Sequence, residues 1–168
     1  MASVRIVNAS PLILLGKIRR LELLFAGESK FIVPSTTFSE AAPQQVATSL
    51  PGWHSGLPPI AIEPDVPIPP EVIRHALDRG ESMVLALALH LRASGDDVEV
   101  VLDERRGRRA AAALELFLVG TAGLVLRAKA EGLLAGSELV RDVLDSLQRD
   151  GKYPGTELRV SILEAADE

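Results

Sequence analysis

Short runs of β-branched residues alternate with helical patterns along this chain. Strand-like runs occupy residues 4–7, 31–33, 98–102 and 117–119, and a helical or Ala/Leu-rich stretch follows each of them. This alternation is typical of βαβ units, in which each helix crosses over the sheet to return the chain to a neighbouring parallel strand. We therefore expect an α/β fold with a small, mostly parallel sheet.

A proline-rich stretch interrupts this alternation. Eight of the 11 prolines fall between Pro43 and Pro70, which excludes a long regular element there and predicts a loop with one short strand at 60–62. Apolar residues such as Leu50 and Trp53 make the stretch too hydrophobic for a disordered linker. With 168 residues, 47% of them apolar, the chain is expected to form one domain over 1–168, with the loop at about 43–70 inside it.

Helical patterns fill most of the remaining sequence. The first covers residues 12–24, and another begins at Pro70 and is expected to end at Gly80, a residue that favours a left-handed helix end. Residues 83–89 form a run that is apolar on every face, which predicts a helix in the middle of the fold. The last three patterns lie at 121–131, 138–150 and 156–166.

Composition excludes several classes of protein. The 18 Lys+Arg and 23 Asp+Glu give a net charge of −5, so the chain as a whole is not a polycation that coats nucleic acid. The absence of cysteine excludes disulfides and thiolate metal sites, and the apolar runs fall short of the ~20 residues that cross a bilayer. We therefore expect a cytoplasmic protein without membrane partners. Phosphate-binding glycine loops, zinc-ligand spacing and a serine-hydrolase elbow are absent as well.

Three carboxylates lie near strand-to-helix junctions. Asp103 directly follows the strand at 98–102, Glu40 follows the strand at 31–33, and Glu81 opens the apolar helix. In an open parallel sheet the ligand crevice forms at the carboxyl ends of the strands, so these acids could meet there. Clusters of oxygen ligands suit Mg²⁺ or Mn²⁺, which activate water toward a phosphodiester. The implied reaction is phosphodiester hydrolysis.

Each acid also has a structural interpretation. Asp103 fits the N-cap of a helix that starts at Arg105. Thr37 and Glu40 have the T-x-x-E spacing of a capping box, in which the carboxylate turns back to a backbone amide. Glu81 would be favourable at the positive end of a helix dipole whether or not it binds anything. Sequence position alone leaves both interpretations open.

Two other groups of polar residues stand close to these acids. Ser10 could bond a phosphate oxygen, or simply begin a helix with Pro11 at its first position. The only dense basic cluster follows Asp103 directly and comprises Arg105, Arg106, Arg108 and Arg109. A phosphodiester chain entering the crevice would pass this cluster, but it would equally suit a solvated helix face.

Five segments of the chain resemble the PIN-domain-like proteins, and within them the uncharacterised bacterial and archaeal branch related to VapC-type toxins. In order, the segments are VRIVNASPLILLGKIRRLELL, FIVPSTTFSE, LDRGESMVLALAL, VVLDERRGRRAA and VGTAGLVLRAKAEGLL. The most specific parts are S-P-L-I-x-L, D-x-G-E and G-T-x-G, and the resemblance runs from about Val4 to the last helix. It implies a three-layer α/β/α fold, Mg²⁺ or Mn²⁺, and ribonuclease activity.

The resemblance also implies a set of site residues. The acidic positions of the family fall on Asn8, Glu40, Glu81 and Asp103, with Glu104 as a neighbour. The family commonly has Asp where this chain has Asn8. An amide oxygen can ligate a hard cation but carries no charge, so the expected cluster falls from four carboxylates to three. Thr121, after the strand at 117–119, is a minor candidate for the same crevice or an N-cap.

These observations support a leading hypothesis and two alternatives. The leading hypothesis is a metal-dependent endoribonuclease that cleaves single-stranded RNA, with Arg105, Arg106 and Arg109 as RNA contacts. The hypothesis extends to the toxin of a toxin–antitoxin pair, which would bind an antitoxin protein. It also includes a homodimer of two copies of the chain. The first alternative is a catalytically degenerate module that binds RNA or protein, which Asn8 motivates. The second alternative is a small-molecule phosphohydrolase.

Overall fold

A five-stranded parallel sheet forms the centre of the molecule. The computed structural model describes residues 3–27, 30–41, 57–58, 60–134, 140–151 and 154–168. Every strand pairing is parallel, and the order is β3-β2-β1-β4-β5. The strands are β1 (Ser3–Val7), β2 (Lys30–Pro34), β3 (Ala61–Glu63), β4 (Asp97–Val101) and β5 (Phe117–Val119). The expected parallel sheet is confirmed, including the short strand within the proline-rich stretch.

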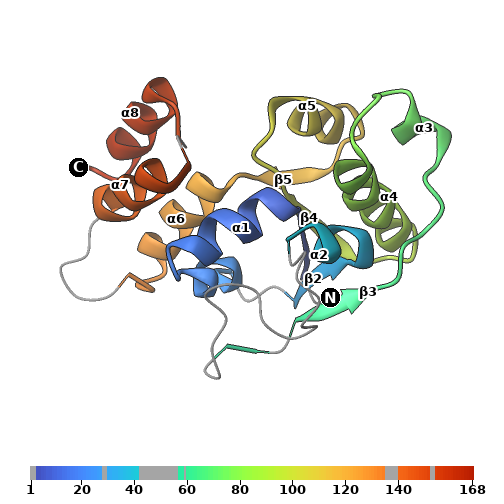
Figure 1. Cartoon of the computed structure of the whole chain (residues 1–168), viewed down its shortest axis with the longest axis horizontal. Helices are drawn as coiled ribbons and strands as arrows, with labels where there is room; N and C mark the ends of the chain where they lie inside the picture. Colours follow the sequence, from blue (N-terminus) through green and yellow to red (C-terminus); the bar gives the residue numbers. More distant parts are fainter. Residues whose placement is uncertain (1–2, 28–29, 42–56, 59, 135–139, 152–153) are drawn as a thin grey trace.

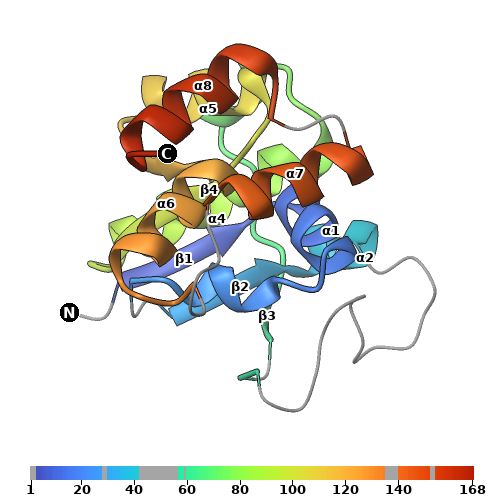
Figure 2. The same ribbon diagram turned by 90° about the vertical axis from the view of Figure 1, so that its left-hand side faces the viewer.

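Helices cover both faces of this sheet (Figures 1 and 2). Successive side chains of a strand point to opposite faces, so Val7 of β1 packs into one core and Ile6 into the other. One face carries α1 (Ala9–Lys17), the 3₁₀ helix η1 (Leu21–Phe25), α6 (Thr121–Ala130), α7 (Val140–Gly151) and α8 (Thr156–Ala165). The other face carries α3 (Pro70–Ile73), α4 (Arg79–Ala93) and α5 (Arg105–Ala113). The expected three-layer α/β/α fold is thereby confirmed.

The helix α4 is the most deeply buried element of its layer. Its residues from Gly80 to Ala88 are all buried, as the apolar run at 83–89 predicts. The expectation that Gly80 ends the preceding helix is wrong. That helix, α3, ends at Ile73, and Gly80 lies in the first turn of α4. A helix begins at this point because Asp78 is the N-cap of α4, and its side chain accepts a hydrogen bond from the Glu81 amide at 2.8 Å.

The helical stretch expected at 12–24 is divided in two. α1 ends at Lys17, Arg19 has a φ of 57°, and the short η1 follows. A left-handed residue ends a helix by turning the chain away from its axis. The start of α1 also differs from the expectation, because the helix begins at Ala9 and Pro11 is its third residue rather than its first.

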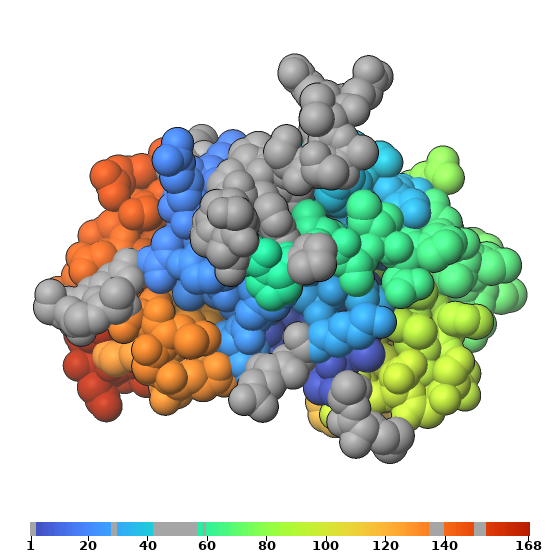
Figure 3. Space-filling view, turned by 90° about the horizontal axis from the view of Figure 1, so that it is seen from below, coloured from blue at the N-terminus to red at the C-terminus, as the bar shows by residue number. Residues whose placement is uncertain are grey.

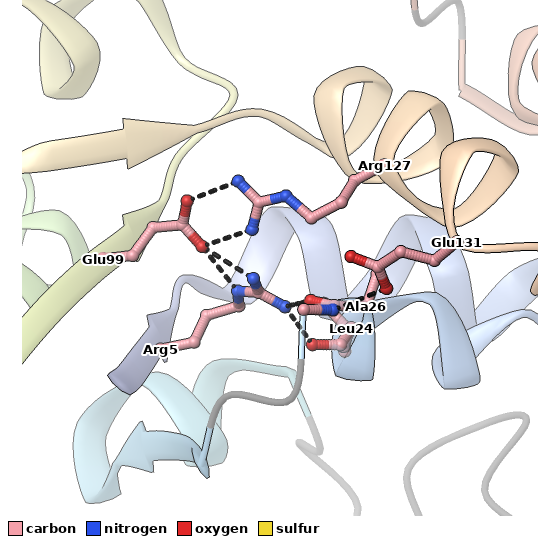
Figure 4. A network of polar contacts seen from close by, with 7 residues as sticks. Arg5, Leu24, Ala26, Glu99, Arg127 and Glu131 are labelled. Atoms are coloured by element: carbon pink, nitrogen blue, oxygen red, sulfur yellow. Dashed lines mark hydrogen bonds and ion pairs between the residues drawn. The ribbon is translucent and has the colours of Figure 1, made fainter. Parts of the chain in front are cut away.

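A buried polar network joins the sheet to the helices on one face (Figure 4). Arg5 of β1 is fully buried, and its Nε donates to Oε2 of Glu99 on β4 at 2.8 Å. Its Nη1 donates to the backbone carbonyls of Leu24, at 2.7 Å, and Ala26. Arg127 of α6 donates two hydrogen bonds to the same Glu99 carboxylate, at 2.9 and 2.8 Å. Glu99 therefore links two strands and one helix.

The segment around β3 lies along β2 at the surface (Figure 3). Residues 42–56 and 59 of the proline-rich stretch, Leu50 and Trp53 among them, lie outside the described residues. Within the described ranges, no helix combines the length and apolar character needed to cross a membrane.

Candidate active site at the carboxyl edge of the sheet

Parallel strands bring the predicted site residues to one edge of the sheet. Asn8 directly follows β1, Asp103 follows β4 by two residues, and Thr121 follows β5 by two. The central strands β1 and β4 are neighbours, and the Asn8 amide donates to the Val101 carbonyl at 3.2 Å. The strand order reverses at this pair, which is where a parallel sheet opens a ligand crevice.

Asp103 and Thr121 are in direct contact. The Asp103 Oδ1 accepts a hydrogen bond from the Thr121 amide at 2.7 Å, and its Oδ2 accepts one from the Thr121 hydroxyl at 2.6 Å. Glu104, not Asp103, occupies the N-cap of α5, so the N-cap interpretation of Asp103 is wrong. Asp103 instead satisfies a free amide at the start of α6, where Gly120 is the N-cap. Two predicted site residues therefore form one unit across β4 and β5.

The capping box expected for Thr37 and Glu40 does not form. Both residues lie inside α2 (Ser35–Ala41), and the Thr37 hydroxyl has no hydrogen-bond partner within the described residues. Asp65, which follows β3, makes hydrogen bonds to the start of α2 instead. It accepts hydrogen bonds from the Thr36 amide, at 2.9 Å, and from the Thr36 hydroxyl. The Glu40 carboxylate is thereby left for another role.

Glu40 rests against the start of α4. Its carboxylate lies so close to Gly80 that a Cβ at this position would collide with it. Glu40 is exposed as a whole, but loss of water around its carboxylate, followed by the negative charge of Asp78, raises its pKa, and the charge of Arg79 only partly opposes this. Gly80 of the D-x-G-E segment is thus explained by the close approach of an acid.

Glu81 is also a carboxylate packed against a glycine, in this case a glycine of α5. The residue is 5% exposed, and its carboxylate lies against Gly107 of α5, where a Cβ would again collide. Its Oε1 is buried without a hydrogen-bond partner in the described part of the chain. Burial, followed by the charges of Asp78 and Glu104, raises the pKa of Glu81, and the charge of Arg106 and a hydrogen bond from the Gly107 backbone only partly oppose this. A buried carboxylate of this kind is costly when ionised unless a cation or donor compensates it.

The predicted residues gather at one edge but do not converge on one point. Within the described ranges, no group of three or more Asp, Glu or His side chains is close enough to hold a metal ion. Asn8 is 5% exposed and makes no side-chain cap of α1, while Ser10 is half-buried in the first turn of that helix. All potential ligands are oxygen atoms, and the unpartnered Oε1 of Glu81 fits a hard divalent cation.

The basic cluster divides according to what its members contact. Arg105 and Arg109 are exposed on α5. Arg106 donates to the Ala76 carbonyl in the segment before α4, and Arg108 donates to the Leu102 carbonyl at 2.9 Å. Arg106 and Arg108 thus each use a donor for a backbone carbonyl of the protein itself.

Sequence reasoning missed three charged residues of this edge: Asp65, Asp78 and Arg79. Asp78 and Arg79 belong to the D-x-G-E segment, so a signal was present, but Gly80 was interpreted as a helix end. Asp65 stands among prolines and approaches α2 only because β3 pairs with β2.

The parallel three-layer fold and the acids at its carboxyl edge define an α/β protein with an acidic candidate site. The family comparison gives the same answer, since the model of the PIN domain matches residues 4–168, and the chain belongs to this family. The resemblance of the five segments to the PIN-domain-like proteins is thereby confirmed, whereas the relation to VapC-type toxins stays a prediction. No curated protein matches the chain.

Proposed function

We propose that this chain is a metal-dependent endoribonuclease that hydrolyses phosphodiester bonds of single-stranded RNA. One observation carries the proposal: the buried Glu81 carboxylate, at the carboxyl edge of a PIN-domain sheet, has an oxygen to which no described residue donates a hydrogen bond. A divalent cation would compensate this charge, and also that of neighbouring Glu40, whose pKa is raised as well.

The acids of the edge take different roles in this proposal. Glu40, Glu81 and Asp103 would hold the ion, which would have to draw these carboxylates closer together than they lie in this structure. Asn8 would add a neutral amide oxygen, and Glu104 would add negative charge nearby. A bound Mg²⁺ or Mn²⁺ supplies charge for the phosphate oxygens and lowers the pKa of water. Because Thr121 fixes both oxygens of Asp103, this carboxylate keeps one orientation while substrate binds.

The substrate proposal rests on the position of the basic residues. Arg105, Arg106 and Arg109 follow Asp103 in the first turns of α5, where a phosphodiester backbone would leave the acids. Phosphate contacts of this kind supply affinity without sequence preference. Ser10 and Thr121 are minor candidates for the same substrate. A toxin role, a VapC relation, an antitoxin partner and a homodimer stay predictions of the resemblance.

A second function is favoured by two observations on the same edge. Asn8 replaces a charged ligand, and both oxygens of Asp103 already accept hydrogen bonds from Thr121. A PIN-domain module that binds RNA or a protein without cleaving RNA would need neither metal nor a fourth acid. The two functions differ in whether RNA is cut.

Cleavage of a mixed-sequence single-stranded RNA with Mn²⁺, Mg²⁺ or EDTA tests the proposal. We expect metal-dependent cleavage by the natural chain and a loss of more than about 100-fold in Asp103→Asn, since a ligand should matter more than an outer-shell partner. The amide of Asn can still accept from the Thr121 amide and donate to its hydroxyl, so the fold should persist. Asp97→Asn, at the opposite end of β4, is the matched control.

Two results would count against this proposal. Cleavage that survives EDTA or Asp103→Asn would place the activity outside this edge. RNA that is bound but never cut would instead support the binding module.

A further inference from the structure

A polar groove lies beside Glu40, on the side of the edge away from α5. It is lined by Ser35, Thr36, Ser39, Glu40, Asp65 and Arg79. These residues come from α2, the segment after β3 and the first turn of α4. Figure 1 shows α2, α4 and α5 gathered on the same side of the molecule. Because Glu40 belongs both to the acid edge and to this lining, the groove continues the acid edge.

The hydroxyl hydrogens of this groove are already committed within the protein. Ser35 donates to the Glu63 carbonyl at 3.1 Å, and Ser39 donates to the Ser35 carbonyl at 2.9 Å. Thr36 donates to Asp65. The hydroxyl oxygens and the carboxylates thus present acceptors to anything that enters. An acceptor-rich wall suits a ligand that carries its own donor.

Arg79 is the one cation in the lining of this groove. Its side chain is 75% exposed, and its ion contact with Asp65 is long, at 4.0 Å. Within the described ranges its guanidinium makes no hydrogen bond. It therefore keeps donors in the fork geometry that matches a phosphate.

Each acid of the pair Glu40 and Glu81 has an arginine near it. Arg79 is the cation that acts on Glu40, and Arg106 is the cation that acts on Glu81. The two arginines belong to the first turns of α4 and α5. A strand whose phosphates meet both arginines would pass directly over the two carboxylates.

Building on the proposed function, we propose that Arg79 binds a backbone phosphate of the RNA substrate on the Glu40 side of the cleavage point. The strand then runs from Arg106 across the acids into the groove. There the ribose 2′-hydroxyl, a donor that DNA lacks, meets the acceptor oxygens of Ser35, Thr36 and Ser39. The groove in this way selects RNA over DNA.

Fluorescence anisotropy with a labelled mixed-sequence 15-nucleotide RNA, in EDTA so that it stays intact, tests this role. We expect Arg79→Ala to raise Kd about tenfold and to reduce the slope of log Kd against log salt by about 0.7, the value for one phosphate of a single strand. Arg79→Lys should keep the slope but bind more weakly, because it lacks the guanidinium fork. The natural chain should bind the DNA of the same sequence less tightly than the RNA.

Arg141→Ala is the matched control, since Arg141 is exposed in the first turn of α7, on the opposite side of the molecule from α4 (Figure 1). We expect no change in this variant. An Arg79→Ala protein that binds RNA with the natural Kd and slope would overturn the role of Arg79 and leave the proposed nuclease standing. Equal affinity for RNA and DNA would overturn the ribose contact. A natural chain that neither binds nor cuts RNA would overturn the proposed function, and this inference with it.

Discussion

Glu81 is the residue on which the proposed metal site depends most. Burial, then Asp78 and Glu104, raises its pKa above that of an ordinary glutamate. The folded state therefore binds its proton more tightly than the unfolded chain does. Without metal, its contribution to stability is complete below the ordinary glutamate pKa and is lost as pH rises through the raised pKa. At neutral pH the metal-free protein carries this cost.

Glu81→Gln should for that reason stabilise the metal-free protein. Gln keeps the shape of Glu without a charge, so the variant should gain about 1–3 kcal/mol at pH 7, the cost of an unsatisfied buried group. Thermal melts from pH 4 to 8 in EDTA should show a higher Tm at neutral pH and a flatter pH dependence. Glu157→Gln, an exposed acid in the first turn of α8, is the control and should change neither. A Tm that falls in Glu81→Gln would mean that the carboxylate is satisfied within the protein.

At the scale of elements, Glu99 holds β1, β4 and α6 together. Burial alone would raise its pKa, but hydrogen bonds and charge from Arg127 and Arg5 outweigh burial and lower it. A lowered folded pKa gives stability that is present above the ordinary glutamate pKa and is lost as pH falls through the folded pKa. The contribution of Glu99 to stability is therefore lost as pH falls, whereas that of Glu81 is lost as pH rises.

Removing the charge of Glu99 should be strongly destabilising. Glu99→Gln leaves the fully buried Arg5 without its counter-ion, and breaking a buried pair in this way costs about 3–5 kcal/mol. Urea unfolding at pH 7 measures the loss, with Glu164→Gln, an exposed acid of α8, as the control. Equal unfolding midpoints for the two variants would show that the Arg5 charge is compensated elsewhere.

The sequence predicted the elements better than their ends. Strand positions follow from β-branched runs and burial, which are local properties, and all five strands were expected. The end of α3 was misplaced because a glycine such as Gly80 is typical of a helix end. A glycine stands there because the Glu40 carboxylate, from a helix distant in sequence, leaves no room for a Cβ. The capping box predicted from the T-x-x-E spacing was wrong for a similar reason. Asp65 accepts the hydrogen bond at the start of α2 instead, and it lies there only because β3 pairs with β2.

At the scale of the whole molecule, the parallel topology brings the candidate site to one edge. Alternating strands and helices were enough to predict that Asp103, Glu40 and Glu81 come to one edge of the sheet. Their partners could not be predicted, because the contact of Asp103 with Thr121 requires β4 and β5 to be neighbours, and strand order is not a local property. The contact of the Glu81 carboxylate with Gly107 could not be predicted either, because it depends on how α4 packs against α5.

Calorimetric titration with Mn²⁺ is the measurement that decides whether this edge is a metal site. The natural chain should bind Mn²⁺, and binding should tighten as pH rises, because protons compete with the ion for Glu40 and Glu81, whose pKa values are raised. Glu81→Gln should lose binding, Asp97→Asn should keep it, and Asn8→Asp should bind more tightly because it restores a charged ligand. A natural chain that binds no Mn²⁺, or a Glu81→Gln protein that binds it equally well, would contradict the metal site proposed for this edge.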